Sequence, residues 1–184
     1  VCAADEAGNY TELSRAELQA NVARLAAGLR DAGIAPGDRV AGIQGNTIDA
    51  LVATLATLSI GAVWTSCSPD FGSTAILDRI GQVAPKALFV TPSYTYGGKT
   101  HDIADRLGDV ASSLPSVTTL ITSGGGMAGA TAQSEFGADA PLGFERLPFD
   151  HPLYVLYTSG TTGRPKAIVH RAGGVILQHM KEHV

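Results

Sequence analysis

The sequence predicts an α/β fold in which helices cover both faces of a mostly parallel sheet. Short apolar, strand-like runs alternate with segments of helical periodicity from residue 14 to residue 122. Single helices between successive strands imply right-handed crossovers that place the strands parallel to one another. The 184 residues are 45% apolar and 16% charged, which is an ordinary globular composition with enough chain for one substantial core.

Helix boundaries can be placed from capping patterns and breakers. Ser14 with Glu17 has the form of a capping box, and the apolar residues that follow share one helical face up to Gly33. Asn46 is expected to cap the second helix, whose nearly all-apolar surface indicates burial, and Pro85 ends the third. Helices are therefore expected at residues 14–33, 47–58, 73–83, 101–114 and 172–183.

Apolar and β-branched runs between these helices predict the strands. They lie at residues 39–44, 62–67, 87–91, 117–122, 153–157 and 167–170. Residues 9–13 should be an extended lead-in, residues 92–99 a loop, and residues 123–147, rich in glycine and alanine, an irregular insertion or linker. The chain does not begin with methionine, so residues 1–184 are expected to be a piece of a longer protein.

Composition excludes several classes of partner. A net charge of −4 and a pI near 5.7 argue against non-specific binding of nucleic acid, and no run of basic residues predicts a membrane surface. The uncharged stretch between Asp49 and Asp70 is interrupted by hydroxyl residues, Gly61 and Pro69, so a buried helix and strand explain it better than a membrane span. Cys2 and Cys67 form no disulfide framework, and no signal peptide is visible, which predicts a cytoplasmic protein.

The segment 157–166, Tyr-Thr-Ser-Gly-Thr-Thr-Gly-Arg-Pro-Lys, has the composition of a phosphate-binding loop. Gly160 and Gly163 let backbone N–H groups approach an anion, and Lys166 supplies a positive charge. Four hydroxyl residues add short donors: Thr158, Ser159, Thr161 and Thr162. A plain turn is the alternative, but the strand, hydroxyls, paired glycines and lysine occur here in the order that a phosphate loop needs. It is not a Walker A loop, because Pro165 precedes Lys166 and Ala167 follows it.

This segment resembles the signature of the AMP-forming adenylating enzymes, Tyr-Thr-Ser-Gly-Thr-Thr-Gly-x-Pro-Lys, with Arg164 at the free position. That superfamily includes acyl-CoA synthetases, peptide-synthetase adenylation domains and luciferases. The stretches most similar to the acyl-CoA synthetases that activate acetoacetate are residues 61–72, 77–79, 85–86, 166–170, 172–174 and 178–183, and the synthetases that activate acetate are near relatives.

The resemblance implies that residues 1–184 are part of the large N-terminal domain of a ligase that acts on small molecules. Such a ligase joins a carboxylate to ATP, releases pyrophosphate and passes the acyl group to coenzyme A. Residues 158–163, Thr-Ser-Gly-Thr-Thr-Gly, would then hold the β- and γ-phosphates with Mg²⁺ nearby, and Lys166 would screen their charge as the catalytic residue. In the acetate-activating relatives an Arg-Gly-Gly-Lys segment contacts the nucleotide of coenzyme A. Tyr96, Gly97, Gly98 and Lys99 occupy the matching place, with tyrosine instead of arginine.

The other parts of the family's active site are expected after residue 184: the adenine-binding segment, the ribose-binding aspartate, the glutamate that holds Mg²⁺ and the C-terminal domain with its catalytic lysine. The chain alone is therefore expected to be inactive. Acetate, propionate or butyrate in place of acetoacetate stays open, because the acyl pocket is expected mostly in the same later residues. A non-catalytic module that binds nucleotide or phosphate is the third alternative.

Three further motifs have weaker context. Residues 124–129 spell Gly-x-Gly-x-x-Gly after an expected strand, but no amphipathic helix follows, as a dinucleotide site requires. Residues 96–100 imitate the end of a Walker loop without its earlier glycine. His179 and His183 belong to a His-x-x-Glu-His pattern known from zinc proteases, and the family resemblance accounts for it without a metal.

Overall fold

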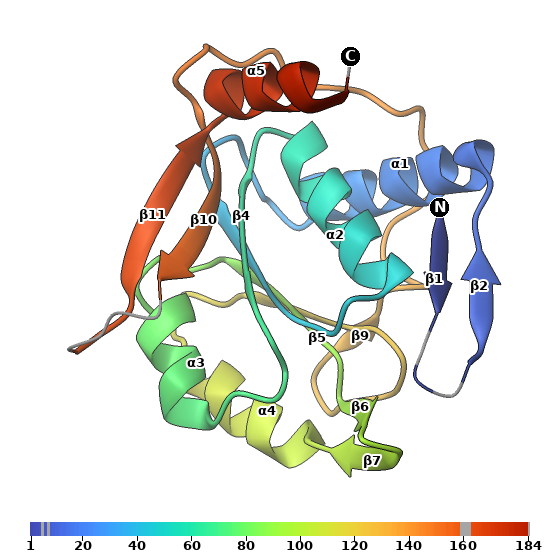
Figure 1. Cartoon of the computed structure of the whole chain (residues 1–184), viewed down its shortest axis with the longest axis vertical. Helices are drawn as coiled ribbons and strands as arrows, with labels where there is room; N and C mark the ends of the chain where they lie inside the picture. Colours follow the sequence, from blue (N-terminus) through green and yellow to red (C-terminus); the bar gives the residue numbers. More distant parts are fainter. Residues whose placement is uncertain (5, 7, 159–162, 184) are drawn as a thin grey trace.

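The structure is a computed structural model of the chain, and it describes residues 1–4, 6, 8–158 and 163–183. Its main sheet is built from β3 (Arg39–Ile43), β4 (Val63–Cys67), β5 (Ala87–Val90), β8 (Thr119–Thr122), β9 (Thr131–Ala132), β10 (Pro152–Thr158) and β11 (Lys166–Arg171). The strand order is β11-β10-β4-β3-β5-β8-β9. Only the pair β10–β11 is antiparallel among these described neighbours. The predicted α/β class and mostly parallel sheet are confirmed (Figure 1).

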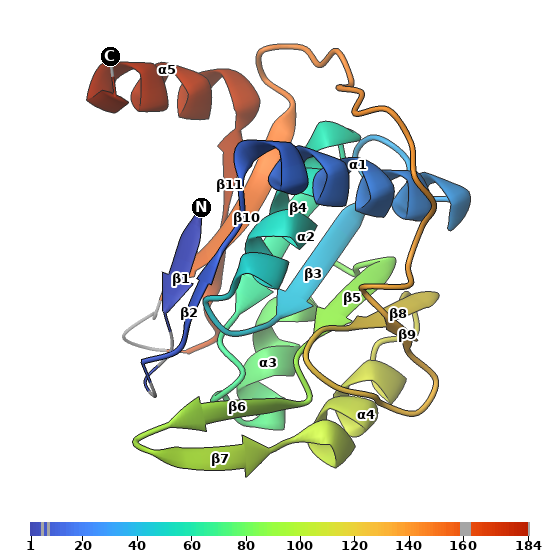
Figure 2. The same cartoon turned by 90° about the vertical axis from the view of Figure 1, so that its right-hand side faces the viewer.

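Helices cover both faces of the sheet (Figure 2). They are α1 (Arg15–Asp31), α2 (Ile48–Ser59), α3 (Ser73–Ile80), α4 (Ala104–Ser112) and α5 (Ala172–His183). Helices α1 and α2 bury Leu25, Leu29 and Ala56 against Trp64 and Phe89 on one face. On the other face α3 and α4 form a second core with the sheet, which includes Ile76, Ile80, Leu107, Ile43 and Leu88. Burying both faces explains why the central strands are almost wholly apolar.

The predicted capping box begins α1. Ser14 N donates to Glu17 Oε2 at 2.8 Å, and Glu17 N donates to Ser14 Oγ at 3.2 Å. The cap predicted for the second helix was wrong by one residue, because Thr47 and not Asn46 caps α2. Thr47 has extended backbone angles, and its Oγ1 accepts from Ala50 N at 3.2 Å. Both residues can cap a helix, and the choice depends on where the chain turns out of β3.

Two hairpins lie beside the main sheet. β1 (Cys2–Ala4) pairs with β2 (Tyr10–Glu12), so the predicted extended lead-in is one strand of a hairpin. The loop predicted at residues 92–99 was wrong, since β6 (Ser93–Tyr96) and β7 (Lys99–Asp102) form an antiparallel pair there. Gly97 and Gly98 have φ of +60° and +71°, which suits the two central residues of a tight hairpin turn. Because β7 takes residues 99–102, α4 begins later than the helix predicted from residue 101.

Residues 123–147, all of which the structure describes, contain no helix and only the short strand β9. The segment lies along α1, where Arg24 Nη1 donates to Gln133 O at 3.0 Å and to Phe136 O at 2.8 Å. A Cβ on Gly137, whose φ is +87°, would overlap the Arg24 carbonyl. Close backbone contact thus holds this irregular segment in place. Among the described residues no helix is both long and apolar enough to cross a lipid bilayer.

Gly42→Ala tests the packing of the central strand. A Cβ on Gly42 would lie 2.7 Å from two ring atoms of Trp64, so the substitution should lower the free energy of unfolding. A decrease of about 1–3 kcal/mol in urea unfolding is expected for such overpacking. Gly108→Ala in α4 is the matched control, since no atom lies within 4 Å of its added Cβ. The control should raise stability by about 0.5–1 kcal/mol. Equal effects of the two variants would contradict the packing argument.

Candidate functional site

Polar residues gather at one edge of the main sheet because its parallel strands end there together. Gln44 follows β3, Ser68 follows β4, Thr91 follows β5, Ser123 follows β8, and Thr158 ends β10. Ligands of open parallel sheets bind outside these carboxyl ends. The candidate functional site therefore belongs to this edge.

A buried polar cluster occupies the centre of the edge. Gln44 Nε2 donates to Ser123 Oγ at 2.9 Å, and Thr91 Oγ1 lies 3.1 Å from the same oxygen. The chain leaves β3 for β4 on one side and later returns to β5 on the other, so this point is the topological switch of the sheet.

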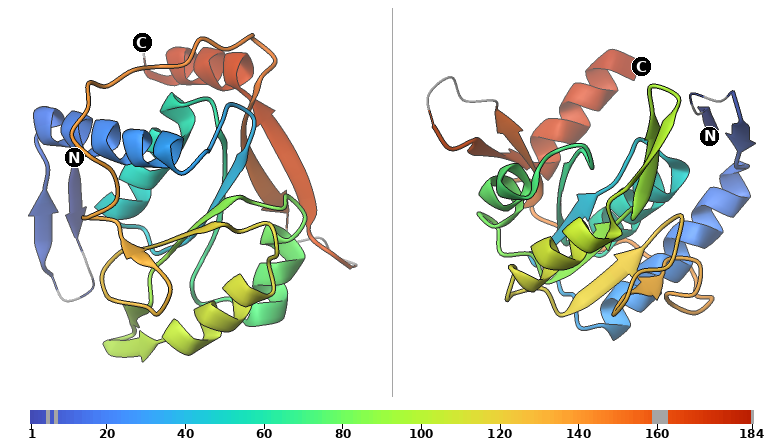
Figure 3. Two further views of the ribbon diagram at one scale, coloured as in Figure 1. Left: turned by 180° about the vertical axis from the view of Figure 1, so that it is seen from behind. Right: turned by 90° about the horizontal axis from the view of Figure 1, so that it is seen from below.

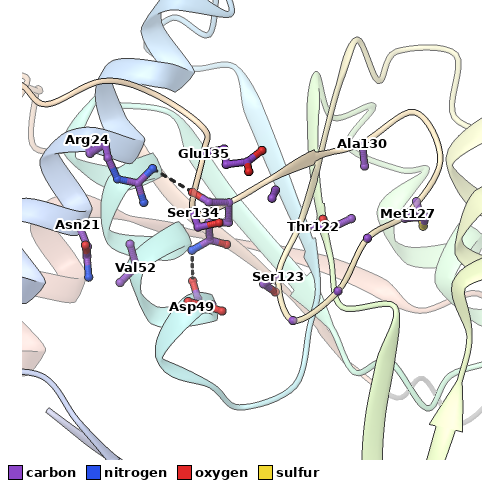
Figure 4. Close-up of a pocket in the computed structure, with 15 residues that line it drawn as sticks. Asn21, Arg24, Asp49, Val52, Thr122, Ser123, Met127, Ala130, Ser134 and Glu135 are labelled. Atoms are coloured by element: carbon purple, nitrogen blue, oxygen red, sulfur yellow. Dashed lines mark hydrogen bonds between the residues drawn. The ribbon is translucent and has the colours of Figure 1, made fainter.

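Cavities flank the cluster on both sides. One of about 550 Å³ lies between the start of α2 and the end of β4, with Gln44, Trp64 and Cys67 in its wall. Another of about 570 Å³ lies between α1, α2 and the segment after β8 (Figure 4). A hydrogen bond joins two parts of its wall, the segment after β8 and α2: Gln133 Nε2 donates to Asp49 O at 3.0 Å.

The predicted phosphate segment forms the connection of the β10–β11 hairpin. Thr158 and Lys166 are paired across the two strands, which brings the hydroxyl residue and the lysine to the same end of the hairpin. Gly163 has φ of +121°, which only glycine adopts readily. Both Thr158 and Lys166 are exposed, so a ligand can reach them. Ser159, Gly160, Thr161 and Thr162 lie outside the described residues.

Both limbs of the hairpin are anchored to elements distant in sequence. At its entry the Tyr157 hydroxyl lies 3.2 Å from Thr65 Oγ1, which also donates to Val155 O at 2.9 Å. Burial raises the pKa of Tyr157 above its ordinary value, so the phenol stays protonated near neutral pH. At the exit Gln82 Nε2 donates to Pro165 O at 2.9 Å. Sequence reasoning missed these anchors, and no local pattern marks Thr65 or Gln82 as partners of residues more than 80 positions away.

The segment predicted to contact coenzyme A forms the turn of the β6–β7 hairpin. Tyr96 is 69% exposed, and Gly97, Gly98 and Lys99 are exposed beside it. Gly98 N donates to Glu6 Oε2 at 3.3 Å. Figure 1 shows this turn well away from the β10–β11 hairpin, with α3 and α4 between them. The two predicted sites are therefore separate surfaces of this chain.

The glycine motif at residues 124–129 lies in a turn, and the pair His179 and His183 lies on a helix. Gly124 and Gly129 take positive φ in a turn after β8, and the next element is β9 rather than a helix. His179 and His183 lie on one face of α5 with ring centroids 5.7 Å apart. Within the described part of the chain, no three His, Cys, Asp or Glu side chains are grouped so that they could hold a metal ion.

Comparison with known proteins agrees with this arrangement. The model of the AMP-binding enzyme family matches residues 1–183. The chain belongs to this family. Its sequence is 49% identical over 177 residues to acetoacetyl-coenzyme A synthetase of Rhizobium meliloti (strain 1021), a match that covers 91% of this chain and 27% of the relative. It is 38% identical to malonamoyl-CoA synthetase of Penicillium aethiopicum, a match that covers 100% of this chain and 28% of that protein.

A solved structure shows the same architecture. Acetoacetyl-CoA synthetase from Streptomyces lividans superposes with a TM-score of 0.91 at 45% identity, covering 95% of this chain and 28% of that one. The family member described here thus spans little more than a quarter of the length of these relatives. The resemblance to acetoacetyl-CoA synthetases inferred from the sequence is confirmed.

The two cysteines should differ sharply in reactivity. Cys67 is buried beside the 550 Å³ cavity, and burial raises the pKa of its thiol to about 12, whereas Cys2 is exposed. Because the thiolate is the nucleophile, iodoacetamide at pH 8 should modify Cys2 alone in the folded protein. Mass spectrometry after labelling checks this, with urea-unfolded protein as the control in which both thiols react. Equal labelling of both cysteines in the folded protein would contradict the buried placement of Cys67.

Proposed function

We propose that this chain carries the pyrophosphate-binding part of an ATP-dependent acid–thiol ligase that activates acetoacetate. The observation that supports the proposal most directly is the end of the β10–β11 hairpin. There Thr158 and Lys166 are paired, exposed and joined by a glycine- and hydroxyl-rich connection at the carboxyl edge of the sheet. High similarity to acetoacetyl-CoA synthetases supports the choice of acid.

The reaction would proceed in two steps. A carboxylate oxygen of acetoacetate attacks the α-phosphorus of ATP, the bond to the β-phosphate oxygen breaks, and pyrophosphate leaves. The thiol of coenzyme A then attacks the acyl carbon of the adenylate, loses its proton and displaces AMP.

In the first step negative charge develops on the leaving pyrophosphate. The proposed donors are the Thr158, Ser159, Thr161 and Thr162 hydroxyls and the backbone N–H groups of Gly160 and Gly163. Lys166 would act as the catalytic residue by placing its ammonium group near the leaving oxygens. Donors aimed at developing charge lower the barrier, because they bind the transition state more tightly than the ground state.

Mg²⁺ and coenzyme A would meet the chain at different places. Mg²⁺ would arrive with ATP and neutralise the phosphate oxygens, a role that it plays in phosphoryl chemistry generally. The β6–β7 turn would contact the nucleotide of coenzyme A through Gly97, Gly98 and the charge of Lys99. Tyr96 cannot make the bidentate phosphate contact of an arginine, so this contact should be weaker than in relatives with arginine.

A related acid is the second candidate, and one comparison favours it. Malonamoyl-CoA synthetase is 38% identical over the whole chain, so a protein this similar to the chain is named for an acyl group other than acetoacetyl. Acetate, propionate and butyrate are the other acids to test. A non-catalytic phosphate-binding module would show no exchange with any of them.

Substrate choice can be measured by ATP–pyrophosphate exchange in the full-length protein that contains this chain. Acetoacetate should support exchange at least about tenfold faster than acetate, propionate or butyrate, a difference of about 1.4 kcal/mol in transition-state binding. The 184-residue chain alone should show no exchange. Faster exchange with another acid would reassign the substrate, and exchange by the chain alone would contradict the division of the active site.

Lys166→Ala in the full-length protein tests the role of the lysine. Loss of its charge should slow adenylate formation about 100-fold, the usual effect of removing one group that stabilises a developing anion. Transfer from a supplied acetoacetyl-adenylate to coenzyme A should change less than about threefold, because pyrophosphate takes no part in that step. Lys181→Ala, at an exposed lysine of α5, is the control. Equal losses in both half-reactions would remove the assigned role.

A further inference from the structure

The exit of the phosphate segment is held by a side chain from another part of the fold. Gln82 Nε2 donates to Pro165 O at 2.9 Å, and Pro165 immediately precedes Lys166. The two residues are 83 positions apart in the chain. Among the described residues, α3 and the turn after it approach this limb of the hairpin, as Figure 1 and both views of Figure 3 show.

The Gln82 carboxamide is itself fixed by the end of α3. Its nitrogen carries two hydrogens, and it also donates to Asp78 O at 2.6 Å. The last carbonyls of a helix lack partners within the helix, so this second bond caps α3 while the first reaches the hairpin. Both hydrogens of the carboxamide thus have acceptors, one on each of the two elements that it joins.

The base from which Gln82 extends is rigid. Ile76 and Ile80 of α3 are fully buried in the core. Directly after Gln82, Arg39 Nε donates to Val83 O at 2.7 Å, and Arg39 Nη2 donates to Ala84 O at 3.0 Å. Arg39 begins the central strand β3, so the turn that carries Gln82 is tied to the middle of the sheet.

The hairpin needs such a support because β11 is the last strand of the sheet and pairs only with β10 among the described strands. Its register sets Thr158 opposite Lys166, but this end of the hairpin has no second neighbouring strand among the described residues. Arg164 Nε and Asp78 Oδ1 are 3.9 Å apart, and both side chains are well exposed, so this ion pair adds little. The Gln82 hydrogen bond is the better-defined contact.

We propose that Gln82 is a positioning residue for pyrophosphate release. By its hydrogen bond to the Pro165 carbonyl, Gln82 fixes the positions from which Lys166 and Gly163 bind the β- and γ-phosphates. This inference rests on the proposed function of the hairpin, and it adds a determinant that lies outside the phosphate segment.

The test uses the full-length protein with Gln82→Ala, Gln82→Asn and the control Gln178→Ala. Gln178 is also an exposed glutamine, but its Nε2 donates within α5, to Glu182 Oε1 at 3.0 Å. Gln82→Asn keeps the carboxamide on a side chain one methylene shorter, so it should not reach Pro165 and should behave like Gln82→Ala. Pyrophosphate affinity is measured by calorimetry, and the KM for ATP and kcat by ATP–pyrophosphate exchange.

Both Gln82 variants should weaken pyrophosphate binding and raise the KM for ATP by about three- to tenfold, the range expected for one hydrogen bond. Transfer from supplied acyl-adenylate should match that of Gln178→Ala, which shows that both Gln82 variants are folded. Pyrophosphate affinity equal to that of Gln178→Ala would overturn the proposal, as would equal losses in both half-reactions.

If the proposed function is wrong, the wild-type protein itself gives different results. If the wild-type protein binds pyrophosphate but exchanges it with no acid, the ligase proposal fails and the affinities of the Gln82 variants still decide the positioning role. If the wild-type protein does not bind pyrophosphate, both proposals fail together.

Discussion

Parallel pairing on both sides of β3 is the constraint on which the rest of the structure depends. β3 pairs with β4 along its whole length and with β5 along most of it, and Val40, Ala41 and Ile43 are completely buried. A strand covered on both faces and paired at both edges must be apolar and in register, which aligns the carboxyl ends of its neighbours. The polar cluster, both flanking cavities and the paired residues Thr158 and Lys166 of the β10–β11 hairpin all lie at that one aligned edge.

The antiparallel strand β11 adds what a purely parallel sheet lacks. After a parallel strand the chain leaves through a crossover, whereas β10 is followed directly by the antiparallel β11, which sets Thr158 opposite Lys166 at one end of the hairpin. This geometry leaves Thr158 and Lys166 exposed, so a ligand can reach them. It also leaves the segment in need of support from outside, which Thr65 provides at the entry and Gln82 at the exit.

Local patterns predicted most of the scaffold, and the errors have local causes. The Ser14–Glu17 capping box and the apolar runs of β3, β4 and β5 depend only on residues that are close together in the sequence, so they can be recognised without the tertiary structure. The β6–β7 hairpin was missed because residues 93–102 are polar and seven of the ten are exposed, so they lack the clear alternation that a buried face imposes. The cap of α2 was misplaced by one residue because Asn46 and Thr47 are both competent caps.

The sequence by itself determined the fold class and the family, and it predicted phosphate binding by residues 157–166, because hydroxyls, glycines and a lysine in that order are typical of a phosphate loop. Tertiary structure alone decided what lies around that segment. Contacts such as Gln82–Pro165 and Tyr157–Thr65 join residues 83 and 92 positions apart, and they form only because α3 and β4 pack beside the hairpin. Hydrogen bonds of this kind depend on side-chain reach across packed elements, which no spacing within the sequence records.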